Sequence, residues 1–189
     1  AMNNELAQST FLPGWLRAVG PGWISWGVES FLDEIADQMG QDPVAMRMGL
    51  LDGAGKNAGG EGSTVGGAKR LAAVLKDVSE RAGWGREMSA NEGLGVAVGH
   101  GQERGMPTWI ACVAHVVVEP SSGHVTLKKL WQTIDVGTVV NPDGAMAQAE
   151  GAALWGVSLA LHEGAQFAKG EVMEQNLDRY TPLRMSDVP

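Results

Sequence analysis

The stretch DVGTVVNPDGAMAQAEG, residues 135–151, joins an alternating segment to a long helical pattern. Residues 125–134 alternate between apolar and polar side chains as a half-buried strand does, and the apolar residues after Pro142 recur at helical spacing. Asn141 stands before that proline, whose ring disfavours helical geometry in the preceding residue and suits the first turn of a helix. The sequence therefore predicts a strand, a turn and a helix that meet at one corner.

This predicted corner has features of an anion-binding site. Free backbone N–H groups and the positive end of the helix dipole gather where a helix begins, and both favour groups such as phosphates. Gln148 lies in the early turns of the predicted helix, and its amide can both donate and accept hydrogen bonds to the edge of a heterocycle. The alternative interpretation is an ordinary connection between strand and helix, because the stretch matches no phosphate-loop or dinucleotide-binding fingerprint.

Length and composition limit the classes of protein that need to be considered. A chain of 189 residues has room for one domain with a hydrophobic core. A net charge of -8 with scattered Lys and Arg argues against a nucleic-acid partner. No apolar run approaches the roughly 20 residues that cross a bilayer, and the first residues lack a signal pattern, so we expect no membrane partner and a cytoplasmic location by default. The single Cys112 excludes an internal disulfide, a Cys-based zinc site and a self-contained iron–sulfur cluster.

The first third of the chain predicts a loop followed by two helices. Residues 11–24 place glycine and proline among apolar side chains, which predicts a loop that carries one cation, Arg17. The first helix is predicted over residues 25–39, with a core stripe of Val28, Phe31, Leu32, Ile35, Ala36 and Met39. A second helix is predicted to begin at Asp42-Pro43 and to end at Gly53.

Three acidic residues, Glu29, Asp33 and Asp37, recur at four-residue spacing along this first helix. Such a row could bind a metal ion, but no histidine joins it. A solvated acidic face is the better interpretation, and we assign no metal ligand.

The rest of the chain predicts a glycine-rich linker and an antiparallel sheet with helices. His115 shares a strand face with apolar residues and is predicted to be a satisfied core or edge histidine. We expect an α+β fold with a small mixed or antiparallel sheet, divided into residues 1–67 and 68–189 of one compact domain. The predicted segments are the linker at residues 53–67, helices at 68–82 and 143–163, strands at 93–99, 108–119 and 125–134, and a short strand at 171–173.

Several short motifs, in this order along the chain, resemble one known family. They are Leu16-Arg17-Ala18-Val19-Gly20, the segment 29–36, Asp42-Pro43 with Arg47, Asp135-Val136-Gly137, Asn141-Pro142, Gln148 with Glu150-Gly151, and Asp178-Arg179-Tyr180. This set resembles the second molybdopterin-binding region of the xanthine dehydrogenase and aldehyde oxidase family, in particular the large subunit of isoquinoline 1-oxidoreductase-like enzymes. Each motif is weak alone, but their order and spacing together are specific.

The resemblance implies an oxidoreductase that hydroxylates an N-heterocycle or an aldehyde with oxygen from water. It implies a molybdopterin dinucleotide carrying molybdenum, and electrons that leave through an iron–sulfur small subunit. By resemblance, Arg17 would orient substrate and stabilise developing negative charge. Gly137, Thr138, Asn141 and Gln148 match the positions that hold the pterin. Glu150 is not assigned as the base, because the family's base is a glutamate in a later Gly-Glu-Pro motif.

That motif and the family's first pterin-binding half are not found in this sequence. We therefore expect a fragment of a large subunit that binds no cofactor and is inactive alone, with the remainder of the subunit as its partner. The alternatives are a non-catalytic binding or interaction module that retains the fold, and an unrelated small-molecule binder. We also expect the tryptophan-rich residues 15–26 to be disordered or to be buried in a homodimer.

Overall fold

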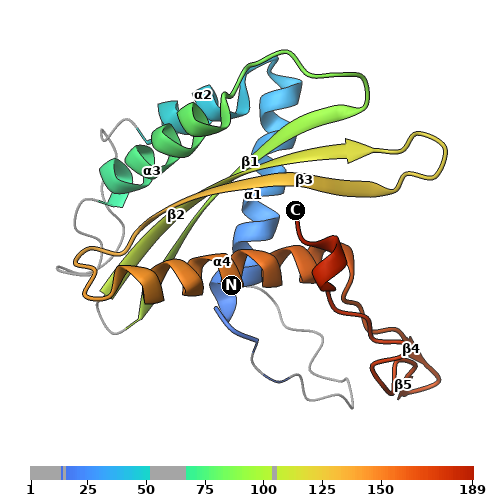
Figure 1. Ribbon diagram of the computed structural model, residues 1–189. Coiled ribbons are helices and arrows are strands. Elements are labelled where there is room, and N and C mark those ends of the chain that lie inside the picture. Colours follow the sequence, from blue (N-terminus) through green and yellow to red (C-terminus); the bar gives the residue numbers. More distant parts are fainter. Residues whose placement is uncertain (1–13, 15, 52–66, 104–105) are drawn as a thin grey trace.

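The computed structural model describes residues 14, 16–51, 67–103 and 106–189, and it confirms the predicted α+β class (Figure 1). A three-stranded antiparallel sheet in the order β1-β2-β3 lies at the centre. The elements are α1 Gly20–Gln38, α2 Pro43–Leu50, α3 Gly67–Ala82, β1 Glu92–Glu103, β2 Met106–Val118, β3 Val125–Asp135, α4 Pro142–Leu161, the small hairpin of β4 Phe167–Ala168 and β5 Glu171–Val172, and a 3-10 turn Met185–Asp187.

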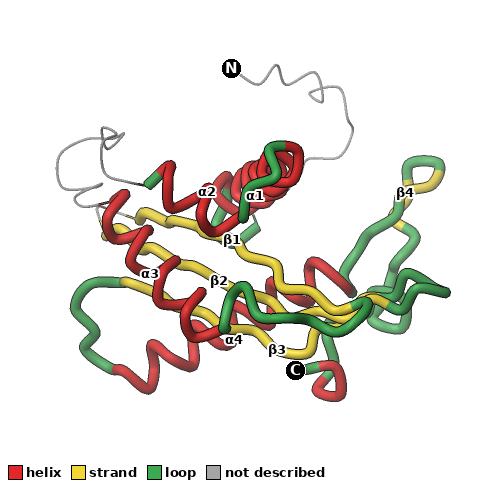
Figure 2. Tube along the Cα trace, turned by 90° about the horizontal axis from the view of Figure 1, so that it is seen from above, coloured by secondary structure: helices red, strands yellow, loops and turns green. Residues whose placement is uncertain are grey.

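The sheet carries helices on both faces. In Figure 1, α2 and α3 lie on one side of the strands and α4 runs along the other, and Figure 2 shows the strands between α3 and α4. Residues that alternate along β1 and β2 face α3 and form the core with it, because successive side chains of a strand point to opposite faces. The buried core consists of Val74, Leu75, Val78, Ala82, Val96, Trp109, Ala111 and Val113.

The strand and helix boundaries agree with the predictions to within a few residues, apart from two. Strand β1 continues to Glu103 rather than residue 99, because Gly99 and Gly101 stay paired with Ile110 and Thr108 of β2. Helix α1 begins at Gly20 rather than residue 25, so the prediction of a loop over residues 20–24 is wrong. Pro21 causes no break there, since a proline in the first turn loses no helical hydrogen bond.

The orientation of α1 also differs from the prediction. Glu29 is buried and Asp33 is half-buried, so the acidic row is not a solvated face, and of the three only Asp37 is exposed. Phe31, predicted to lie in the core, is 61% exposed. The cause is Arg47 of α2, which is 1% exposed and needs carboxylate partners to be stable inside the protein. Val28 and Met39, also predicted for the core stripe, are exposed as well.

Two other predictions concern residues 15–26 and the linker. Trp23 and Trp26 belong to helix α1 and are exposed, so the prediction that they lie in a loop is wrong. Trp15 lies outside the described residues. The predicted linker also falls outside them up to residue 66, and Gly67 opens α3. The division of the chain at residue 67 stays a prediction. Within the described ranges, no helix is both long and apolar enough to cross a membrane.

Candidate cofactor-binding corner

The corner begins where β3 ends, at Asp135. The carboxylate of Asp135 accepts a hydrogen bond at Oδ1 from the amide of Gly137, with a distance of 3.0 Å. Gly137 has a φ of 76°, in the left-handed region that glycine adopts without steric cost. The turn between strand and helix therefore needs both the carboxylate and the glycine.

Arg70 of α3 holds this carboxylate from the other side. Its Nε lies 2.6 Å from Asp135 Oδ2, and its Nη2 donates to Oδ1, which makes a two-pronged contact. The guanidinium also stacks on Trp109, 3.9 Å from the ring centroid. The end of β3 is thereby fixed to both α3 and β2.

This contact also sets the charge of the corner. The hydrogen bond from Arg70 lowers the pKa of Asp135, as does the amide of Gly137, while Asp135 raises the pKa of Arg70. The carboxylate is therefore ionised and neutralised by its partner at physiological pH, so that it repels an incoming anion less than a free Asp would.

The start of α4 forms the other side of the corner. Asn141 is the N-cap, and its Oδ1 accepts from the amide of Gly144 at 3.0 Å. This assigns the Asn141 side chain a structural role that the sequence alone did not reveal. The amides of Thr138, Val139 and Val140 have no hydrogen-bond partner within the described part of the chain. These N–H groups next to a helix start are available to an anionic ligand.

Gln148 and Arg17 are related through α4. Gln148 is exposed, and Trp155 follows it by seven residues, so the two share a face of the helix about 10 Å apart along its axis. The guanidinium of Arg17 lies over the Trp155 ring at 5.5 Å from the centroid. The structure thus brings four of the sequence-predicted site positions, Gly137, Thr138, Asn141 and Gln148, to the β3–α4 turn and the first turns of α4, and places Arg17 further along the Gln148 face.

The far end of α4 is tied to the C-terminal segment by a polar network. Ser158 is 4% exposed, donates to Glu163 at 2.5 Å and accepts from the amide of Leu183 at 2.8 Å. Tyr180 donates to the other oxygen of Glu163. Hydrogen bonds from Ser158 and Tyr180 lower the pKa of Glu163, and its carboxylate raises the pKa of Tyr180. The network fixes the segment around Asp178-Arg179-Tyr180, one of the motifs shared with the family, to the end of α4.

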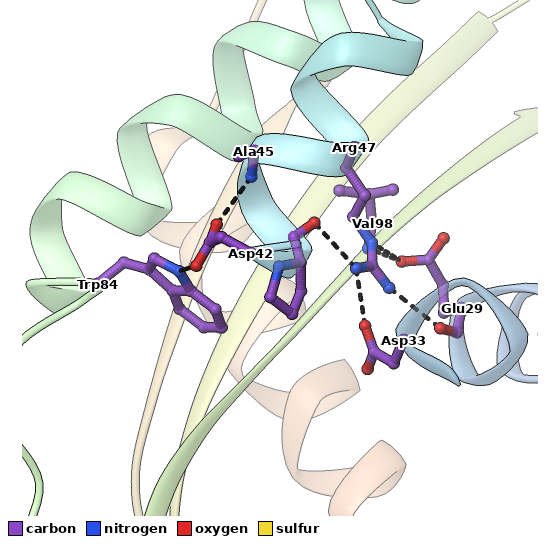
Figure 3. Close-up of polar contacts among 8 residues, drawn as sticks. Glu29, Asp33, Asp42, Ala45, Arg47, Trp84 and Val98 are labelled. Atoms are coloured by element: carbon purple, nitrogen blue, oxygen red, sulfur yellow. Dashed lines mark hydrogen bonds and ion pairs between the residues drawn. The ribbon is translucent and has the colours of Figure 1, made fainter. Parts of the chain in front are cut away.

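A second network, shown in Figure 3, supports the scaffold rather than the corner. Glu29 Oε2 accepts from Arg47 Nε at 2.9 Å and from the amide of Val98 on β1 at 2.8 Å. Asp42 caps α2 and accepts from the indole N–H of Trp84 at 2.7 Å. These contacts join α1, α2, the end of α3 and β1.

His115 lies on the central strand β2, is half-buried, and has Glu92 as its partner, with a carboxylate oxygen 3.1 Å from Nε2. The prediction of a satisfied histidine is confirmed, although its strand is not at the edge of the sheet. In the ranges that the structure covers, no group of three or more His, Cys, Asp or Glu is placed to hold a metal ion.

Sequence reasoning missed Arg70. A partial signal was present, because Asp135 has the same strand parity as Trp131 and Thr133. These two pair with core residues of β2, so that all three lie on the face that α3 covers. A carboxylate on that face needs a cation from α3. The first arginine of that helix is Arg70.

This turn brings together the available amides of residues 138–140, the exposed side chain of Gln148 on the same helix and Arg17 beyond it, and is the candidate cofactor-binding corner. The family model of the molybdopterin cofactor-binding domain matches residues 45–189. The chain belongs to this family.

Named relatives point to the same class of large subunits. The chain is 52% identical over 190 residues to the membrane-bound aldehyde dehydrogenase (pyrroloquinoline-quinone) of Gluconacetobacter polyoxogenes, and it covers 25% of that protein. It is 33% identical over 175 residues to the beta subunit of isoquinoline 1-oxidoreductase from Brevundimonas diminuta, with 93% of this chain and 20% of that protein aligned. It is 27% identical over 188 residues to a nicotinate dehydrogenase subunit from Pseudomonas putida, covering 93% of this chain and 15% of that protein.

These matches confirm the family resemblance of the sequence motifs. The chain spans about a quarter or less of the length of these relatives. It is therefore homologous to one region of molybdenum hydroxylase and aldehyde dehydrogenase large subunits.

Proposed function

We propose that this region forms one wall of the molybdopterin site in the large subunit of an oxidoreductase that converts an aldehyde and water into a carboxylic acid, two electrons and two protons. The observation that carries the proposal is the row of available amides at residues 138–140, beside the start of α4. The aldehyde class is favoured by the relative that is 52% identical, and an N-heterocycle is the alternative substrate.

The residues at the corner suit an anionic, heterocyclic group. Amides at residues 138–140 would donate to phosphate or carbonyl oxygens, and the Gln148 amide would pair with a pterin edge. When bound, the molybdenum cofactor supplies the oxidation chemistry. Arg17 would hold the substrate carbonyl and stabilise negative charge as it develops, with Trp155 keeping its guanidinium over α4.

The surface of α4 supports a larger assembly. Its side chains are apolar on nearly every side, yet only Ser158 is buried, and Met146 is 59% exposed. A helix of this composition normally lies inside a protein core. The rest of the large subunit would cover α4 and the exposed Trp23 and Trp26 of α1, and an iron–sulfur subunit would accept the electrons.

It follows that the 189 residues alone would retain no molybdenum and reduce no dye. They would also associate as a homodimer through the uncovered apolar surface of α1 and α4. Sedimentation of the purified chain tests the second point: a monomer at micromolar concentration would contradict the homodimer.

An assay on the full-length large subunit tests the function itself. With an aliphatic aldehyde, an aromatic aldehyde and isoquinoline as substrates, we expect dye reduction with the aldehydes, and a strong loss of turnover in Arg17→Ala. A retained cofactor with no turnover on any of the three would support the alternative of a non-catalytic module.

A further inference from the structure

We propose that Arg70 is a positioning residue for the cofactor corner, acting through Asp135 on the turn at Gly137. This inference rests on the proposed function of the corner. Arg70 would not touch the cofactor; it would fix the direction in which the amides of residues 138–140 point.

Arg70 is held firmly from two sides. Its two-pronged contact reaches both oxygens of Asp135, with Nε 2.6 Å from Oδ2. The face of the guanidinium rests on Trp109, which is 4% exposed and belongs to the core. A planar group that is both stacked and paired at two points has little freedom to reorient.

The pair of Arg70 and Asp135 also contacts the turn. Oδ1 of Asp135 is shared, since it accepts from Arg70 and from the amide of Gly137 at 3.0 Å. A Cβ at Gly137 would lie 3.8 Å from Arg70 Nη2, so the guanidinium borders the turn itself. Releasing Asp135 would therefore free the Gly137 amide and the backbone that follows it.

Arg81 lies on the same face of α3 as Arg70, three turns further along. Arg81 also reaches β3, with Nη1 3.4 Å from the carbonyl of Gln132 and from Thr133 Oγ1. It pairs with Asp77 at 3.6 Å, and its polar contacts within the described ranges stop short of the turn. Arg81 thus links the same two elements without reaching the turn and provides a matched control.

The experiment uses the full-length large subunit with its partner subunit, as wild type and as Arg70→Gln, Arg70→Lys, Asp135→Asn and Arg81→Gln. Two quantities are measured: hydrogen exchange of the peptide covering residues 136–145, and pterin and molybdenum per large subunit after gel filtration. Thermal unfolding of each variant reports general stability. Arg70→Lys keeps the charge and serves as the test where Arg70→Gln does not fold.

We expect about tenfold faster exchange in the peptide and about a tenfold lower cofactor content for Arg70→Gln and Asp135→Asn. Arg70→Lys should restore neither fully, because an ammonium group lacks the planar fork. Arg81→Gln should change neither, even with an equal fall in melting temperature. Full cofactor content and unchanged exchange in Arg70→Gln would overturn the inference, whereas a wild-type protein without pterin would instead refute the proposed function.

Discussion

Arg47 and Glu29 form a buried ion pair that fixes α2 against α1. The guanidinium of Arg47 donates from Nε to the Glu29 carboxylate at 2.9 Å and from Nη2 to the Glu29 backbone carbonyl at 3.0 Å. Its Nη1 lies 2.7 Å from Asp33 Oδ1, as an ion pair outside hydrogen-bond geometry. The Glu29 side chain also accepts from the amide of Val98, so the pair orients α1 on the edge of the sheet.

Removing one partner of this pair should destabilise the chain strongly. Arg47→Ala leaves Glu29 buried without its cation, and we expect a loss of about 3–5 kcal/mol in the free energy of unfolding. Urea denaturation of the 189-residue chain measures it. Lys76→Ala is the control, because its pair with Glu80 is exposed and 3.9 Å long, and should change the value by less than about 1 kcal/mol. Equal effects would show that the pair does not hold α1.

Two glycines should respond in opposite directions to alanine. Gly137→Ala forces a side chain into the left-handed region at a φ of 76°, at a cost of about 1–2 kcal/mol. Gly151→Ala lies within α4 with open space around the new Cβ, and should stabilise the isolated chain by about 0.5–1 kcal/mol. Urea denaturation measures both changes in the free energy of unfolding. A Gly137→Ala variant as stable as the wild type would show that the turn does not require a positive φ at this residue.

The Asp135 carboxyl should titrate below its usual range. Its pKa is lowered from 3.8 by Arg70, so the folded state binds fewer protons than the unfolded state as the pH falls through this region. The stability from the pair is therefore complete well above pH 3.8 and is lost progressively below it. Carboxyl NMR titration should find the depressed pKa in the wild type and a higher pKa in Arg70→Gln. An unshifted wild-type pKa would contradict the contact.

Trp155 should matter for the placement of Arg17. Trp155→Leu removes the aromatic face under the guanidinium, 5.5 Å away, which is worth about 0.5–1 kcal/mol at an exposed site. We expect kcat/KM for aldehyde oxidation by the full-length enzyme to fall about two- to fivefold. Trp155→Phe should recover part of the loss, and Leu159→Ala, one turn along the same helix, serves as the control. Unchanged kinetics in Trp155→Leu would show that the contact between Arg17 and Trp155 does not contribute to catalysis.

Much of the fold could be predicted from local patterns. Strand β3 and helix α4 meet where the alternation after Val125 gives way to Asn141-Pro142, because register and capping are encoded locally. The orientation of α1 could not be predicted, because it depends on Arg47, 18 residues further along the chain from Glu29. Hydrophobic periodicity alone directed Phe31 inward, whereas burying the ion pair directs it outward.

The candidate site likewise has features that could be predicted from the sequence and features that required the structure. A turn at Gly137 and a helix start at Asn141-Pro142 could be predicted, since a glycine in a turn and a residue before proline leave signatures in the sequence. The strand parity of Asp135 indicated a cation on the facing helix, but identifying that cation as Arg70 required the packing of α3 on the sheet, because Arg70 lies 65 residues before Asp135. The capping role of the Asn141 side chain likewise requires the structure, since a sequence motif names a residue and leaves its hydrogen-bond partner open.

The cofactor content of the full-length large subunit tests whether the β3–α4 corner holds a molybdopterin. It is measured as molybdenum by metal analysis and as pterin by fluorescence after oxidation. A quinone assay runs in parallel, because the name of one relative includes pyrroloquinoline-quinone. We expect about one molybdenum and one pterin per large subunit in the wild type, a marked loss of both in Gly137→Ala and Gln148→Ala, and an unchanged content in Arg17→Ala. A quinone without pterin, or a pterin content that neither corner variant lowers, would contradict this expectation.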